Sequence, residues 1–376
     1  MLMSETAKGK KISRRVFARR GSLAVAAGLI TPVPLQASVT ASHERLAMHQ
    51  QQSARGVVCM ICPNECTLKD GEVSDCHNRV ARRSKLYTMA FGNPCAANID
   101  PMEKKPLYHF LPGTSVFSIA TAGCNFACLN CQNWTISQTS PDKTKNYDMP
   151  PDDVVARALA GGSGSIAYTY SEPVTFYEYV YETSRVAHEK GLRNIMVSNG
   201  YINKEPLRDL CRYIDGANID LKSFSDSTYL KLTGGRLQPV LDALRVYRDE
   251  GVWLEITNLV VPGWTDKPDE IREMCRWLSG NGFSDTPLHF SRFHPQYKLE
   301  HLPPTPLKIL ETAVKIAHDE GIKFVYMGNV PGSGHDDTIC PSCGKKLIDR
   351  SGFRIVTDEI RNGRCGCGTV IPGVWS

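Results

Sequence analysis

The chain has 376 residues, of which 41% are hydrophobic and 22% are charged, and its formal net charge is +5. Seven lysines and arginines lie in the first 20 residues against Glu5 alone, so the remainder is close to neutral, at −1. A large globular domain with small attachments fits these values, whereas a nucleic-acid-binding face gets no support from them, and no nucleic-acid partner is expected.

Residues 1–41 have the pattern of an export signal. The pair Arg14 and Arg15 precedes the mildly apolar run "GSLAVAAGLITPVPLQASVTAS", with small residues near Ala37 or Ala41. This pattern resembles the twin-arginine signal of proteins that are exported folded, so a periplasmic or cell-envelope location is expected. The run is too short for a typical spanning helix. A disordered basic tail or a lasting membrane anchor are the alternatives, and an unused signal would leave the protein cytoplasmic.

Residues 42–113 are interpreted as a polar linker and an N-terminal cysteine-rich module. The four closely spaced thiols are Cys59, Cys62, Cys66 and Cys76. Four thiolates can close around zinc or an auxiliary iron–sulfur cluster, and the sequence does not choose between them. His77 or Cys95 could replace one ligand. Thiols that are merely buried or disulfide-linked are the alternative, because an exported protein favours disulfides.

Residues 114–330 alternate between short β-rich runs and amphipathic helical runs. The predicted strands are 115–121, 165–171, 194–200, 216–223, 253–263, 288–295 and 322–330. The predicted helices are 152–162, 176–191, 204–214, 240–251, 270–280 and 307–321. This alternation predicts an α/β fold with parallel strands, as an open sheet or a full or partial barrel, whose chemistry gathers at the carboxyl ends of the strands.

Residues 331–376 form a second predicted cysteine-rich module. Its thiols are Cys340, Cys343, Cys365 and Cys367. Two cysteine hooks about twenty residues apart resemble a zinc ribbon or a rubredoxin-like pair of knuckles, with a structural or protein-docking role. Cys211 and Cys275 lie on apolar helix faces and are expected to be core residues without chemistry.

The segment "TAGCNFACLNCQNW", residues 121–134, places Cys124, Cys128 and Cys131 directly after the first predicted strand of this array. Three thiolates leave one iron of a cubane cluster without a protein ligand. A zinc knuckle with a distant fourth ligand is the alternative. The spacing resembles that of the radical S-adenosylmethionine (radical SAM) superfamily. The resemblance implies a partial (β/α)6-type barrel and a [4Fe–4S] cluster whose free iron binds S-adenosylmethionine. Reductive cleavage then gives a 5′-deoxyadenosyl radical that abstracts hydrogen.

Later motifs resemble the branch related to the activating enzyme of pyruvate formate-lyase. In "YTYSEP", the resemblance makes Ser171 and Glu172 candidates for the methionine amino group. In "IDLKS", Asp220 would hold the ribose hydroxyls and Lys222 the methionine carboxylate. The two side chains point to the same side of a strand, at i and i+2. A solvated surface pair is the alternative reading of Asp220 and Lys222.

Two further residues are expected near the mouth of the barrel. Asn199 follows a predicted strand, and His294 in "FHP" is a possible contact near the adenosyl group, although a lone histidine is more often structural. One departure concerns the residue before the last cysteine, which is usually aromatic in the superfamily and is Asn130 here.

Across residues 57–376 the combined motifs resemble the radical SAM component of the AmmeMemoRadiSam system. The added motifs are "FHPQY", "GNVPG" and "IPGVW". The resemblance implies a reductant protein of ferredoxin or flavodoxin type and a possible protein substrate, with Memo-type or AMMECR-type proteins as partners. A glycyl-radical-enzyme activase is the alternative reaction. A non-catalytic iron–sulfur electron carrier or redox sensor is the alternative of another class, and it would need no nucleoside site.

Overall fold

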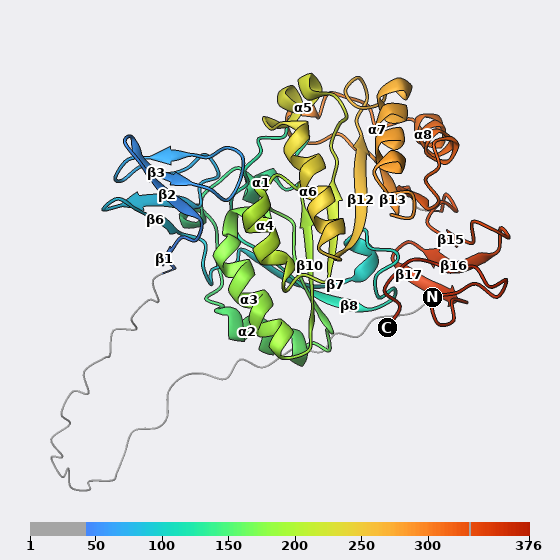
Figure 1. Ribbon diagram of the computed structural model, residues 1–376, viewed down its shortest axis with the longest axis horizontal. Helices are drawn as coiled ribbons and strands as arrows, with labels where there is room; N and C mark the ends of the chain where they lie inside the picture. Colours follow the sequence, from blue (N-terminus) through green and yellow to red (C-terminus); the bar gives the residue numbers. More distant parts are fainter. Residues whose placement is uncertain (1–42, 331) are drawn as a thin grey trace, which may run out of the picture. The chain divides into compact units, whose positions relative to one another are not determined.

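The computed structural model describes residues 43–330 and 332–376, so the predicted export signal lies outside the described residues (Figure 1). The centre is an eight-stranded sheet with the order β14-β13-β12-β11-β10-β9-β8-β7. Its strands are β7 (Ala96–Pro101), β8 (Ser115–Ala120), β9 (Ser165–Tyr168), β10 (Arg193–Ser198), β11 (Gly216–Asp220), β12 (Trp253–Val260), β13 (Leu288–Arg292) and β14 (Val325–Gly328). Strands β8 to β14 are parallel, and β7 pairs antiparallel with β8.

Helical connections join the successive parallel strands. The helices are α1 (Trp134–Ser137), α2 (Pro151–Ala160), α3 (Tyr177–Glu189), α4 (Lys204–Cys211), α5 (Asp226–Thr233), α6 (Leu237–Asp249), α7 (Pro268–Gly280) and α8 (Leu307–Asp319). Six strand–helix units are therefore followed by a seventh strand, and β7 and β14 stand at opposite edges of the sheet. The predicted α/β architecture with a partial barrel is confirmed. Strand β7 and helix α5 were not expected.

Burial explains why these segments form a covered parallel sheet. All four residues of β9 are buried, as are five of the six residues of β8. A parallel strand that is buried on both faces has a nearly continuous run of apolar residues in its sequence, because neither of its faces meets water. In α8 the buried residues Leu310, Ala313 and Ala317 form one stripe, which packs toward β13 and β14. Within the described residues, no helix combines the length and apolarity needed to cross a bilayer.

Small antiparallel sheets flank the central sheet. The strands before it are β1 (Arg45–Leu46), β2 (Gln50–Ser53), β3 (Gly56–Cys59), β4 (Thr67–Leu68), β5 (Arg79–Arg82) and β6 (Lys85–Thr88), in the orders β1-β6-β5 and β2-β3-β4. The strands after it are β15 (Thr338–Ile339), β16 (Lys346–Ser351) and β17 (Arg354–Asp358). The first group is fixed to α3 by a buried ion pair between Arg79 and Glu178. All described residues belong to one compact unit.

Candidate functional site

The loop with three cysteines follows β8 at the carboxyl edge of the parallel sheet. Its backbone is fixed to the end of α5, since the Ala127 N–H donates to the Thr233 carbonyl at 2.8 Å. The ring of Phe126 is 4% exposed and packs on Tyr201, with ring centroids 4.8 Å apart. A buried aromatic ring and a backbone hydrogen bond therefore hold the loop in place. The positions of its thiols depend on the residues around them.

The thiols themselves are buried or half-buried. The Cys124 sulfur accepts from the Phe126 N–H at 3.4 Å and lies 3.9 Å from Asn199 Nδ2. Burial raises the pKa of Cys128 to about 11, although the Lys222 ammonium opposes the rise, and burial raises that of Cys124 well above its usual value. Without metal the thiols of Cys124 and Cys128 are protonated, so metal binding must displace their protons.

The separation of the thiols distinguishes two kinds of metal site. A tetrahedral zinc ion with bonds of 2.3 Å places its sulfur ligands about 3.8 Å apart. Among the described residues, the set of cysteine, histidine and acidic groups that gathers its ligand atoms within 4.8 Å is the C-terminal one, not the loop. The loop thiols are thus not gathered within this distance. A cubane places several metal ions between its thiolates and does not require such close sulfurs.

Glu172 lies buried at the end of β9 and accepts three hydrogen bonds. Its Oε1 accepts from Ser198 Oγ at 2.7 Å and from the Val174 N–H at 3.1 Å, and its Oε2 accepts from the Asn199 N–H at 2.9 Å. Burial raises its pKa to about 7. A carboxylate has about four lone-pair sites, so one remains for a ligand. The Glu172 side chain is therefore bound mainly to the end of β10, through Ser198 and Asn199.

Asp220 and Lys222 lie at the end of β11, on the same side of the chain. Lys222 Nζ is 2.8 Å from Asp220 Oδ2, and their side chains are 22% and 35% exposed. Burial alone would lower the pKa of Lys222, but the neighbouring Asp220 outweighs burial and raises the pKa. The pair is partly open and lies close to Cys128 of the cysteine loop.

The remaining predicted residues occupy different environments. Ser171 Oγ donates to the Thr121 carbonyl at 2.6 Å, which ties β9 to the start of the loop. Asn199 Nδ2 donates to Asn125 Oδ1 at 2.8 Å, so this side chain supports the loop. His294 is exposed beyond the end of β13. The structure brings Cys124, Glu172 and Asn199 together, because Asn199 contacts both the Glu172 carboxylate and the Cys124 sulfur. His294 remains at the rim of the site.

Several site residues were missed by the sequence reasoning. Trp134, 40% exposed, stacks on Tyr297 with ring centroids 5.1 Å apart at the rim of the loop. Asn258 Nδ2 donates to the Leu221 carbonyl at 2.7 Å, whereas its buried Oδ1 has no partner. The buried Oδ1 of Asn130 also has none. Unpartnered acceptors beside the Asp220–Lys222 turn and within the loop are suited to a polar ligand such as a nucleoside. A polar residue inside a largely apolar predicted strand was the available signal for Asn258.

The C-terminal cysteines form a compact set. Cys340 Sγ is 3.7 Å from Cys367 Sγ, and Cys343 Sγ is 3.7 Å from Cys365 Sγ. These distances match the sulfur separation of about 3.8 Å expected around one tetrahedral ion. Cys340 and Cys365 are buried, whereas Cys343 and Cys367 are exposed. The geometry suits a single ion at the surface of this module.

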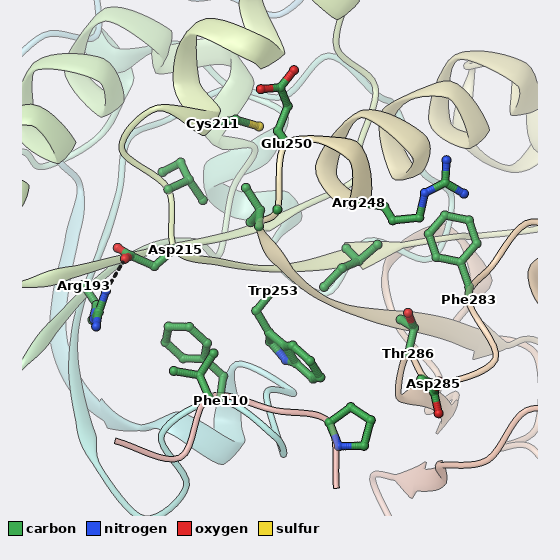
Figure 2. Close-up of a pocket in the computed structure, with 16 residues that line it drawn as sticks. Phe110, Arg193, Cys211, Asp215, Arg248, Glu250, Trp253, Phe283, Asp285 and Thr286 are labelled. Atoms are coloured by element: carbon green, nitrogen blue, oxygen red, sulfur yellow. Dashed lines mark hydrogen bonds and ion pairs between the residues drawn. The ribbon is translucent and has the colours of Figure 1, made fainter. Parts of the chain in front are cut away.

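A cavity of ≈ 630 Å³ lies at the opposite end of the sheet (Figure 2). Arg193, Asp215 and Trp253 line it, at the amino ends of β10, β11 and β12, together with Phe110 and Pro372. Because chemistry in parallel α/β folds collects at the carboxyl ends of strands, this cavity is not the candidate active site.

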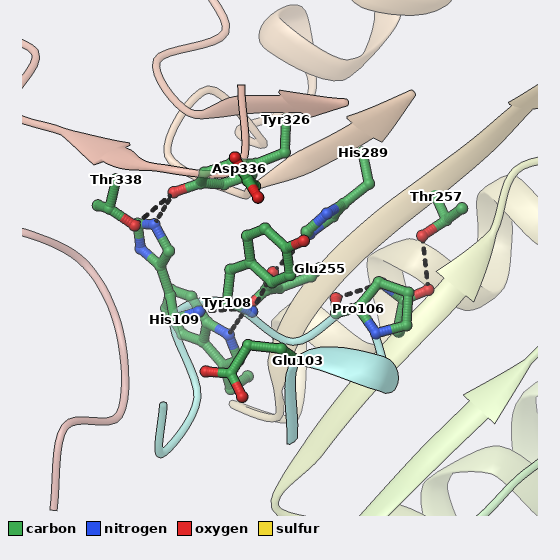
Figure 3. A network of polar contacts seen from close by, with 12 residues as sticks. Glu103, Pro106, Tyr108, His109, Glu255, Thr257, His289, Tyr326, Asp336 and Thr338 are labelled. Atoms are coloured by element: carbon green, nitrogen blue, oxygen red, sulfur yellow. Dashed lines mark hydrogen bonds and ion pairs between the residues drawn. The ribbon is translucent and has the colours of Figure 1, made fainter. Parts of the chain in front are cut away.

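A buried polar network also lies toward this end (Figure 3). Glu255 Oε1 accepts from the His109 N–H at 2.7 Å, and Glu255 Oε2 is 2.7 Å from His289 Nε2. His109 Nε2 is 2.6 Å from the Tyr326 hydroxyl, which lies 3.0 Å from Thr338 Oγ1. Burial alone would raise the pKa of Glu255, but His289 outweighs it and lowers the pKa. The network joins the sheet to the C-terminal module and has a structural role.

The chain is similar to several known proteins. The family model described as the radical SAM superfamily matches residues 118–278. An uncharacterised protein of Methanocaldococcus jannaschii is 45% identical over 318 residues, which cover 84% of this chain and 95% of the relative. Pyruvate formate-lyase 1-activating enzyme of Escherichia coli is 24% identical over 218 residues, covering 54% of this chain and 89% of the enzyme. The crystal structure of a radical SAM methyltransferase from Sphaerobacter thermophilus aligns with a TM-score of 0.46 and 16% identity, covering 58% of this chain and 67% of that one.

Proposed function

Because the chain belongs to the radical SAM superfamily, we propose that it is an enzyme that cleaves S-adenosylmethionine reductively and removes hydrogen from a substrate. Cys124, Cys128 and Cys131 are the proposed ligands of a [4Fe–4S] cluster. When bound, this cluster supplies the electron that splits the sulfonium into methionine and a 5′-deoxyadenosyl radical. The observation that carries the proposal is a loop of three thiols, not all within 4.8 Å of one another, beside the ion pair of Asp220 and Lys222.

The residues around the loop are proposed to orient S-adenosylmethionine. The Lys222 ammonium would pair with the methionine carboxylate, and the Asp220 carboxylate would accept from the ribose hydroxyls. Ser171 and the remaining lone-pair site of Glu172 are the proposed contacts of the amino group. Asn199 acts on the loop itself, since it approaches Cys124 and Asn125.

The substrate is proposed to enter at the rim formed by Trp134 and Tyr297. An exposed indole stacked on a phenol offers a flat apolar contact next to the cysteine loop. Abstraction from a protein or a small molecule is compatible with this rim. Activation of a glycyl-radical enzyme is the second candidate function, and the similarity to the Escherichia coli activating enzyme supports it.

Further parts of the proposal concern metals, partners and location. We propose one zinc ion for the C-terminal thiols, because they are spaced for a single tetrahedral ion. A ferredoxin- or flavodoxin-type protein is the proposed reductant. The motif resemblance supports a place in the AmmeMemoRadiSam system, with Memo-type or AMMECR-type partners. The pair Arg14 and Arg15 supports export by the twin-arginine route.

The test is S-adenosylmethionine cleavage by the full chain. The protein is reconstituted anaerobically with iron and sulfide, reduced with dithionite and assayed for 5′-deoxyadenosine. We expect 5′-deoxyadenosine with the wild type and none with Cys128→Ala. Cleavage that survives in Cys128→Ala would contradict the cluster assignment. A wild-type cubane that yields no 5′-deoxyadenosine would instead favour the electron carrier or redox sensor.

A further inference from the structure

The four N-terminal thiols are brought together by a tight loop between β3 and β4. The Cys59 N–H donates to the Cys66 carbonyl at 3.0 Å, and the Glu65 N–H donates to the Cys62 carbonyl at 3.1 Å. Burial, and after it the charges of Cys59, Cys76 and Cys66, raise the pKa of Cys62. The mutual electrostatic influence of these groups places the four thiols in one region, to which Cys76 is supplied by a separate turn.

Hydrogen-bond donors approach each of these sulfurs. Backbone N–H groups of Ile61, Asn64 and Asp75 bond to three of them, Cys59, Cys62 and Cys66. The hydroxyl of Ser74 lies 3.1 Å from Cys76 Sγ. Donors placed beside sulfur can also bond to sulfur that is bound to a metal, so the loop offers a supporting shell for a metal centre.

The Arg79 guanidinium provides an independent sign of an anionic ligand. Its side chain is 1% exposed, and its Nη1 pairs with Glu178. Its Nη2 is buried without a hydrogen-bond partner. The thiols of Cys59 and Cys76 are also close enough to Arg79 to interact with it electrostatically. A buried guanidinium donor is costly to leave unpaired, so an acceptor is expected on the side of the thiols.

The spacing of the four thiols decides which acceptor fits. Among the described residues, the sulfurs of the four C-terminal cysteines lie within 4.8 Å of one another, and those of the four N-terminal cysteines do not. An iron–sulfur core is wider than one ion and adds inorganic sulfide, which accepts hydrogen bonds. We propose that Cys59, Cys62, Cys66 and Cys76 hold an iron–sulfur cluster whose sulfur accepts an N–H from Arg79.

The proposed cluster adjoins the catalytic loop. The Cys76 carbonyl lies against Gly123, and Asn78 Nδ2 donates to the Ala122 carbonyl at 2.7 Å. We assign to it, resting on the proposed function, the relay of single electrons from a ferredoxin- or flavodoxin-type donor. The cluster gains one electron from the donor and gives one to the catalytic site, so it is unchanged after each transfer.

The test separates the two cysteine sets in the full chain. The variant Cys124→Ser/Cys128→Ser/Cys131→Ser is reconstituted anaerobically with iron and sulfide, and its iron, zinc and acid-labile sulfide are measured. We expect iron and sulfide in equal amounts, about two or about four of each per chain. Adding Cys59→Ser and Cys62→Ser should abolish the sulfide. Adding Cys211→Ser and Cys275→Ser instead, as the matched control, should leave it.

Acid-labile sulfide distinguishes the two kinds of site, because a single metal ion bound by the C-terminal thiols brings no inorganic sulfide with it. No sulfide in the triple variant, with about two zinc ions per chain, would overturn the proposal, as would sulfide that survives Cys59→Ser/Cys62→Ser. If the triple variant keeps sulfide while the wild type cleaves no S-adenosylmethionine, only the proposed function fails. Arg79→Lys keeps the charge opposite Glu178 but loses the planar fork, so the potential of the remaining cluster should become more negative. An unchanged reduction potential in Arg79→Lys would show that Arg79 does not bond to the cluster.

Discussion

The carbonyl oxygen of Cys76 lies directly against Gly123, the residue before the first cysteine of the catalytic loop. A Cβ atom at position 123 would overlap this oxygen and lie 2.8 Å from Asn78 Nδ2. The backbone φ of Gly123 is +99°, which side chains rarely adopt. The N-terminal module can therefore approach the loop this closely because residue 123 has no side chain.

We expect Gly123→Ala to lower the melting temperature and the iron content of the reconstituted protein. Its positive φ alone costs about 1–2 kcal/mol, and the overlap with Cys76 adds to this. The matched control is Gly162→Ala, since Gly162 has a φ of +68° but no atom within 4 Å of the added Cβ. Equal losses in both variants would show that backbone strain alone is responsible and that the contact with Cys76 does not matter.

Lys222→Ala should weaken the binding of S-adenosylmethionine about 10- to 100-fold, because a hydrogen bond to a charged group contributes about 1.5–3 kcal/mol. Equilibrium binding to the reconstituted protein measures this. Lys267 also forms a 2.8 Å ion pair, with Glu270, but on the surface of α7. Lys267→Ala should bind as the wild type does. Wild-type affinity in Lys222→Ala would place the methionine carboxylate elsewhere.

Cys343→Ser should release about one metal ion per chain and lower the melting temperature, since a structural ion contributes to folding only while bound. Metal analysis with calorimetry checks both effects. Because these thiols are far along the chain from the cysteine loop, acid-labile sulfide should not change. A wild-type metal content in Cys343→Ser would mean that the 3.7 Å contacts hold no ion.

The stability of the protein should fall as the pH drops from 6.5 toward 4. Burial lowers the pKa of His109 to about 4, so the unfolded chain binds this proton first and the folded form loses stability. At pH 5 the loss from this group amounts to about 2 kcal/mol relative to pH 7. Urea unfolding at both pH values measures the change. His109→Gln should show a smaller change, and an equal change would assign the acid sensitivity to other groups.

Most elements of the central sheet could be predicted from the sequence because their apolar runs are long and their ends carry glycine or polar residues. Strand β7 was missed because only one of its six residues is buried and it holds no continuous apolar run. Helix α5, "DSTYLKLT", is short and mixed in polarity. Its position matters nonetheless, because its last residues hold the backbone of the cysteine loop.

At the site, local spacing was informative and long-range contacts were not. The pairing of Asp220 with Lys222 follows from the period of two in an extended chain. The contact of Glu172 with Asn199 depends on β9 and β10 being neighbours, which a single sequence does not specify. The pairing of Arg79 with Glu178 joins residues 99 positions apart, in a module and a helix whose packing has no local signature.

The hydrogen bond between His109 and the Pro372 carbonyl joins residues 263 positions apart at the amino end of the sheet. Ordering so long an intervening segment is entropically expensive, so contacts of this separation form late in folding. Because Pro372 lies near the end of the chain, the amino end of the sheet can be closed only after almost the whole chain has been synthesised.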